Sequence, residues 1–362
     1  MNQRKPRKAR RTWGALVFFV LLLAGCHQAE NPWHYQARKA NAAPKLNDKI
    51  DFLEERLQSR PRAFLEMAEL AGLYLQRGKS RRDQSDVDKA QEWVERSLEE
   101  FENAPALLVR ADALQMEHHF TEALEVLQKA LALDPGNLAA RLLEVRVRLA
   151  RGDVAGARES FQKLPESPLS SFRFLEARLE EESGHLVEAR KLYEASLRGE
   201  SDISSPSESA RRRAVFARME LKAGDLDKAE RLLQAALAIP VDQPLAQLLL
   251  GRLHSERGEY KQAAEALRAG YERYGDPLFL VHLGLAEEKA GSKAAARSTL
   301  QTAAQLLRQD NFGHERDLAL ALFHLDPEGN SDEIEELMAA ELKRRRDSET
   351  LEVADSVGVK VE

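Results

Sequence analysis

Cysteine and aromatic residues are scarce in this sequence of 362 residues. Its one cysteine is Cys26, which excludes an intramolecular disulfide and a cysteine metal cluster. Aromatic residues make up 6% of the sequence. The apolar run at residues 13–25 is also short, because a helix needs about 20 residues to cross a bilayer comfortably.

Motifs of common enzyme classes are missing as well. The sequence has no HExxH, G-x-S-x-G, P-loop or G-x-G-x-x-G pattern. The nine histidines are scattered, and the adjacent pair His118 and His119 cannot share one helix face. We expect these two to be turn or surface residues and not metal ligands. We therefore predict no catalytic residue, no metal and no cofactor, and no small-molecule substrate is evident.

Positive charge is concentrated at the start of the sequence. The formal net charge is -6, and residues 1–25 hold six Arg and Lys residues and no acid. Removing that segment would leave a formal charge of -12. A protein this acidic is a poor general binder of nucleic acid, which requires a positive surface.

The first 26 residues have the layout of an export signal: a basic stretch, a short apolar run, and small residues at its end. The ending Leu23-Ala24-Gly25-Cys26 resembles the lipobox of bacterial lipoproteins, in which the signal is cut before a cysteine that becomes acylated. The resemblance implies a signal peptide at 1–25 and a lipidated Cys26 starting a tether at 26–49, anchored by several acyl chains. His27, in place of an aspartate, implies the outer membrane, facing the periplasm. An ordinary signal peptide with an incidental cysteine and an uncleaved anchor are the alternatives.

A ladder of seven alanines marks the rest of the sequence. Their spacings are 33, 34, 32, 40, 34 and 33 residues, and a recurring period near 34 indicates a repeat array. The ladder consists of Ala90, Ala123, Ala157, Ala189, Ala229, Ala263 and Ala296. A glycine five residues before each of the last five predicts a turn between two helices. A small residue or valine twelve positions before each of the last six predicts that the two helices cross closely.

This pattern resembles the tetratricopeptide repeat family over six units from about 104 to 309, with a diverged unit at 64–103. The family's tryptophan is absent, and a six-residue insertion lies near 201–206. The resemblance implies an all-α, right-handed superhelical solenoid of about seven helix hairpins at 50–311. Beyond it we predict C-terminal capping helices at 312–346 and a frayed tail at 347–362.

Four units carry an arginine directly after the small first-helix residue: Arg146, Arg178, Arg218 and Arg252. In tetratricopeptide repeats this position faces the concave groove, so the resemblance implies a positive row there. Guanidinium groups bind carboxylates in bidentate fashion, so the row could hold an acidic peptide segment or the C-terminus of another protein. Apolar contact would come from Leu142, Phe174, Leu149 and Leu245.

An alternative is that these arginines only pair within the protein and bind nothing. Suitable acids lie one helical turn away, in the pairs Arg178–Glu182 and Arg252–Glu256, or on adjacent helices.

The expected function is a membrane-anchored, non-enzymatic scaffold or adaptor in the bacterial cell envelope, with other proteins or peptide segments as partners. A self-associating spacer and an accessory subunit of an envelope enzyme or export complex are the alternatives. A repeat-mounted enzyme would need a catalytic domain, and no stretch of about 100 residues is left for one.

Overall fold

The computed structural model describes residues 46–81, 83–167, 169–200, 205–309 and 313–361. All regular structure in these ranges is helical, and no helix there is long and apolar enough to cross a membrane. The predicted signal peptide, Cys26 and most of the predicted tether lie outside the described residues.

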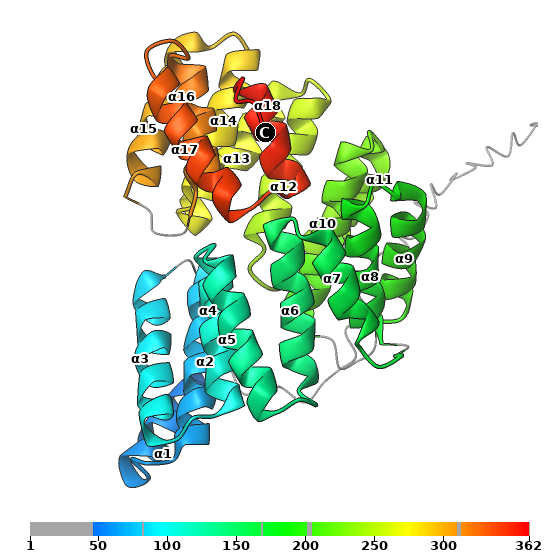
Figure 1. Ribbon diagram of the computed structural model, residues 1–362. Coiled ribbons are helices and arrows are strands. Elements are labelled where there is room, and N and C mark those ends of the chain that lie inside the picture. The colour runs from blue at the N-terminus through cyan, green and yellow to red at the C-terminus, as the bar shows by residue number, and fades with distance from the viewer. Residues whose placement is uncertain (1–45, 82, 168, 201–204, 310–312, 362) are drawn as a thin grey trace, which may run out of the picture. The chain divides into compact units, whose positions relative to one another are not determined.

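Three helices precede the first well-matched repeat unit (Figure 1). They are α1 (Leu46–Ser59), α2 (Phe64–Arg81) and α3 (Gln84–Glu100). Twelve helices follow as six consecutive pairs, namely α4 (Ala104–Met116) with α5 (Phe120–Leu133), α6 (Leu138–Arg151) with α7 (Val154–Gln162), α8 (Ser170–Glu182) with α9 (Leu186–Arg198), α10 (Pro206–Lys222) with α11 (Leu226–Leu237), α12 (Pro244–Glu256) with α13 (Tyr260–Tyr274), and α14 (Pro277–Lys289) with α15 (Lys293–Leu307). The last helices are α16 (Glu315–Leu325), α17 (Ser331–Arg344) and α18 (Ser348–Ser356).

The alanine ladder lies in the interface between the two helices of each pair. All seven ladder alanines are at most 3% exposed. A Cβ built on Gly251 would lie 2.4 Å from the Cγ atom of Leu267, and one built on Gly284 would lie 2.5 Å from that of Leu300. The predicted close crossing of the paired helices is therefore confirmed, because these positions have no room for a side chain.

Glycine forms five of the turns within the pairs, with φ between 75° and 84° at residues 152, 184, 224, 258 and 291. This left-handed backbone suits glycine and ends the first helix. In the α4–α5 turn, His118 takes the same place with φ 59°, the one such non-glycine residue in the described ranges. Its ring stacks on Phe120 and meets the edge of His314, so this turn contacts the connection between α15 and α16.

The last helices include an element that the sequence did not predict. On α17, Ile334, Met338 and Leu342 are buried, in keeping with a helix that covers the end of the core. We expected residues 347–362 to be frayed, but the structure places α18 there, with Thr350 and Ala354 buried. A nine-residue helix has no repeat period and depends on contacts distant in sequence, so the pattern could not reveal it.

The connection between α17 and α18 is fixed to the end of α6. The Arg346 N–H donates a hydrogen bond to the Arg151 carbonyl oxygen at 2.8 Å. A Cβ on Gly152 would lie 2.4 Å from the Arg346 carbonyl carbon, so the backbones meet without room for a side chain. The polypeptide thus returns to its middle repeats before α18 begins.

Candidate functional site

Three of the four predicted arginines line one cavity. Arg146 on α6, Arg178 on α8 and Arg218 on α10 surround a space of about 330 Å³, whose far wall is formed by residues 345–349. Each of the three helices is the first of its pair, as the repeat position required. We call this space and the neighbouring arginine contacts of α18 the arginine groove.

The cavity has more cationic than anionic side chains. Its six cations are Arg146, Arg178, Arg211, Arg218, Lys222 and Arg345, and its four carboxylates are Glu182, Glu208, Asp347 and Glu349. The formal excess is two positive charges in a protein whose net charge is negative. The groove therefore favours an anionic ligand on electrostatic grounds.

Two of the arginines are partly neutralised from within the repeats. Arg146 pairs with Asp112 at 3.1 Å, and Arg178 pairs with Glu182 at 3.0 Å, which is the internal pair that the sequence offered as an alternative. Burial works against the charged form of Arg178, but nearby carboxylates outweigh it and raise its pKa. Internal pairing thus accounts for part of the row.

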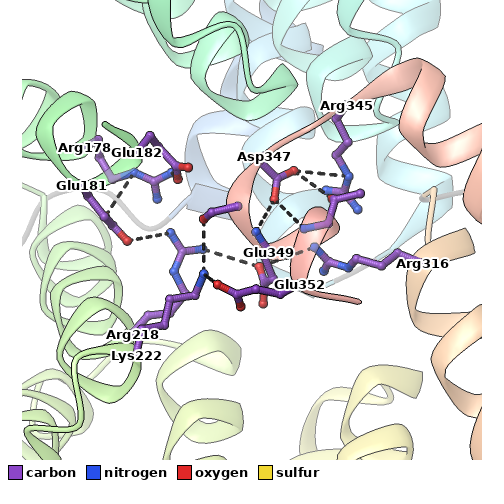
Figure 2. Close-up of polar contacts among 12 residues, drawn as sticks. Arg178, Glu181, Glu182, Arg218, Lys222, Arg316, Arg345, Asp347, Glu349 and Glu352 are labelled. Atoms are coloured by element: carbon purple, nitrogen blue, oxygen red, sulfur yellow. Dashed lines mark hydrogen bonds and ion pairs between the residues drawn. The ribbon is translucent and has the colours of Figure 1, made fainter. Parts of the chain in front are cut away.

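The other two arginines meet a carboxylate of the C-terminal helix. Glu349 on α18 lies 3.4 Å from Arg252. It also lies 3.9 Å from Arg218 and 3.5 Å from Arg316 on α16 (Figure 2). The sequence suggested Glu256 as the partner of Arg252, but the structure pairs Arg252 with Glu349. Arg252 itself is not among the residues that line the cavity.

Electrostatics at Glu349 favour its charged form. Burial alone would raise its pKa, but the charges of Arg316, Arg218 and Arg252 outweigh burial and hold the pKa well below its usual range. The carboxylates of Asp317 and Glu349 likewise raise the pKa of Arg316 against the effect of its burial. Both groups are therefore charged across the neutral pH range.

Two further acids of this segment have defined roles. Glu352 accepts a hydrogen bond from the Lys222 amine at 2.8 Å, and Lys222 also donates to the Ser348 hydroxyl at 3.2 Å. Asp347 caps α18 by accepting hydrogen bonds from the backbone N–H groups of Glu349 and Thr350, each at 3.1 Å. The start of α18 thus places Glu349 and Glu352 beside cations of α10, α12 and α16. Figure 2 shows those of α10 and α16.

The groove arginines keep unused hydrogen-bonding capacity. The Nε atoms of Arg218 and Arg316 are buried and have no hydrogen-bond partner among the described residues. Both ion pairs of Arg218, to Glu181 at 3.8 Å and to Glu349, are too long for a hydrogen bond. A bound carboxylate could satisfy such a guanidinium group better than the present contacts do.

Apolar residues complete one wall of the cavity. Leu142, Leu149 and Phe174, which the sequence suggested for apolar contact with a partner, line it, although Phe174 is only 6% exposed and belongs mainly to the core. Leu245 is not among the lining residues and packs against the core of the neighbouring units. Within the described residues, no group of three or more metal-ligating side chains is present.

Sequence reasoning missed several groove residues, and some of them carried a signal. Arg211 and Lys222 lie seven residues before and four after Arg218, which places all three on one face of α10. Asp347 followed by Glu349 has the character of a helix start, with a capping acid and a second acid in the first turn. Arg316 lies beyond the repeats, and no periodicity pointed to it.

The comparisons with known proteins agree with this architecture. Family models described as tetratricopeptide repeat match residues 114–169, 214–276 and 248–313. Tetratricopeptide repeats are thus recognised in these segments. Such repeats suggest a protein–protein interaction scaffold, and they are typically non-enzymatic. A search of curated protein sequences found no match.

Solved structures of low sequence identity share the fold. The anaphase-promoting complex hetero-tetramer Cut9–Hcn1 aligns with a TM-score of 0.57 at 19% identity, covering 86% of this chain and 59% of that one. The human IFIT1 dimer aligns with a TM-score of 0.53 at 14% identity, covering 87% and 77%. A tetratricopeptide repeat protein from Parabacteroides merdae aligns with a TM-score of 0.50 at 16% identity, covering 67% and 92%. The predicted all-α superhelical solenoid of tetratricopeptide hairpins is therefore confirmed.

Proposed function

We propose that this protein is a lipid-anchored tetratricopeptide scaffold of the bacterial envelope that binds an acidic protein segment in the arginine groove. One observation carries the proposal: the groove already holds an acidic helix start of the protein itself, at residues 347–352. A site that fits one such segment has the shape and charge to fit another. The positive excess around the cavity favours the same class of ligand.

The membrane part of the proposal rests on the sequence alone. The basic start, the short apolar run and the ending Leu23-Ala24-Gly25-Cys26 support cleavage before Cys26 and acylation of its thiol. Several acyl chains hold a protein to a bilayer where a single one is marginal. His27 after the cysteine supports the outer membrane, with the repeats in the periplasm.

Site-specific crosslinking in cells tests the groove. A photoreactive amino acid is placed at Ser171, which lines the cavity, and in a matched control at Val187, which is 68% exposed on α9. We expect Ser171 alone to capture an envelope protein, through a segment rich in Asp and Glu. Reversing the charge of Arg178 and Arg218 should reduce that capture severalfold.

Two outcomes would contradict the scaffold proposal. One is the same set of captured proteins from Ser171 and Val187. The other is unchanged capture by the charge-reversed variant when its circular dichroism spectrum and melting temperature show an intact fold. Crosslinks only between copies of this protein would favour the self-associating spacer instead.

Metabolic labelling with a fatty-acid analogue tests the anchor separately. We expect the wild-type protein to incorporate the label and to fractionate with outer membranes. Cys26→Ser should lose the label while leaving the repeats unchanged. Label that persists after this substitution would refute the assignment of Cys26.

A further inference from the structure

We propose that α18 is an internal stand-in for the partner: an acidic helix binds the arginine groove by displacing α18 and taking over its carboxylate contacts. This inference rests on the proposed function and specifies its ligand. The partner segment is a helix whose capping acid is followed by acids two and five residues later, the spacing of Asp347, Glu349 and Glu352.

α18 is held by ion pairs at its N-terminal end and by a short apolar face, on which Leu351 and Val353 also pack against the core. Two carboxylates, of Glu349 and Glu352, and the Ser348 hydroxyl meet the groove at its N-terminal end. Its buried residues are Thr350 and Ala354, followed by Val357 just beyond its end. A helix of nine residues is not stable by itself in water, so α18 persists only while these contacts hold. Such a helix can be released without unfolding the repeat pairs.

An acidic helix start is the feature that the groove recognises. Glu349 and Glu352 are three residues apart and therefore share one face of α18. Carboxylates in the first turn also interact favourably with the positive end of the helix dipole. Arg218, Arg252 and Lys222 supply complementary charges from two consecutive repeat units.

The segment also leaves part of the groove unfilled. The cavity of about 330 Å³ lies directly beside Asp347 and Glu349, and its other wall carries Arg146 and Arg178. Those two arginines pair with carboxylates of the repeats themselves. A partner that extends beyond the start of its acidic helix can enter this space and reach Arg146 and the buried Nε of Arg218. It can therefore make contacts that α18 does not make.

Displacement must overcome the covalent link of α18 to the rest of the protein. A short tether holds a segment at an effective concentration on the order of millimolar, so a free copy of the same segment competes poorly. Removing the acids of α18 while leaving its length unchanged should therefore expose the groove to a ligand added in solution.

The test measures binding of a fluorescein-labelled peptide, residues 347–362, to the full-length protein in detergent by fluorescence anisotropy. Glu349→Gln with Glu352→Gln removes two acids of α18 and leaves the arginines and the lysine of the groove unchanged. Glu335→Gln with Glu336→Gln removes two exposed acids from α17 as a matched control. We expect the peptide to bind the first variant at least about tenfold more tightly than it binds the wild type or the control. Binding to the first variant should weaken with salt and be lost after Arg218→Glu.

Hydrogen exchange gives a second readout on the wild-type protein. Unlabelled peptide at several millimolar, above the roughly millimolar effective concentration of the tethered segment, should reduce amide protection in residues 348–356 of the protein and leave α10 and α12 protected. Equal peptide affinity for the wild type, the variant and the control would overturn the proposal, as would binding that leaves α18 protected.

A folding failure is addressed by a second variant that ends after Arg346. If the glutamine variant is unstable, the truncated protein should still melt cooperatively and bind the peptide. If both variants lose cooperative melting, α18 is a structural part of the fold and the proposal fails. Groove crosslinks to an envelope protein that persist in that case would leave the scaffold function standing and reject only displacement.

Discussion

The alanine ladder and the arginine row run side by side through the same repeats, yet they behave differently. Every ladder alanine is buried against the other helix of its own pair. The arginines range from 18% to 45% exposed and have different partners, from a residue one turn away to Glu349 near the C-terminus. The ladder alanines have the same surroundings in every unit, whereas the surroundings of the arginines differ from unit to unit.

The difference shows what a repeat period can encode. A helix pair makes the same internal contact in every unit, so its small residues recur. The groove instead faces whatever lies opposite, and here Arg345, Asp347, Ser348 and Glu349 from beyond the repeats form part of its lining. Other repeat residues also meet elements outside the array. His118 in the α4–α5 turn contacts the α15–α16 connection, and Gly152 contacts Arg346. Function at such a face depends on contacts that no single unit contains.

The largest expected effect on stability is at Gly284, the small first-helix residue twelve positions before the ladder alanine Ala296. Gly284→Val forces a side chain into the space held by Leu300, which is itself buried. Overpacking of this kind should lower the free energy of unfolding by about 3 kcal/mol, as measured by urea denaturation. Ala295→Val, at an exposed position of α15, is the control and should cost less than about 1 kcal/mol. Equal losses of stability in the two variants would show that the close helix crossing does not explain why small residues recur at these positions.

Acid should destabilise the folded protein through His282 on α14, which interacts electrostatically with Arg252 and Glu349. Burial, followed by the charge of Arg252, lowers the pKa of His282 from 6.5 to about 4, although Asp317 and Glu349 partly oppose this. The unfolded protein therefore takes up a proton first as the pH falls, and stability present above pH 6.5 is lost as the pH falls toward 4. Between pH 6.5 and 5 this should cost about 2 kcal/mol, from about 1.4 kcal/mol per pH unit.

His282→Gln should reduce that loss, while stability at pH 8 reports any structural cost of the substitution. The measurement is the urea midpoint of both proteins at pH 8, 6.5 and 5. His118 adds a similar acid-sensitive contribution, because burial, followed by the charge of Arg345, lowers its pKa to about 3. Parallel pH profiles for wild type and His282→Gln would show that His282 does not remain neutral in the folded protein.

Sequence alone could predict the repeated part of this structure but not the closure of its groove. The ladder predicted the helix pairs and their close crossing, and the resemblance placed Arg146, Arg178 and Arg218 on one face. Arg252 and Leu245 do not line the cavity, because its lining also depends on where residues 345–349 lie. The position of α18 follows from long-range ion pairs to Glu349, for which a period of about 34 residues holds no information.

The smallest expected effect is at Arg146, the most exposed arginine of the row. Its side chain is 45% exposed and pairs with Asp112, which Lys79 also contacts at 2.6 Å. Arg146→Gln should therefore change the free energy of unfolding by less than about 0.5 kcal/mol, since solvent screens an exposed pair and a second cation remains. The same substitution should still weaken binding of an acidic peptide to the opened groove, because the lost charge faces the cavity. Urea denaturation and peptide anisotropy on one variant separate the two effects. A large loss of stability would mean that Arg146 belongs to the structural framework, whereas a loss confined to binding would assign it to the ligand.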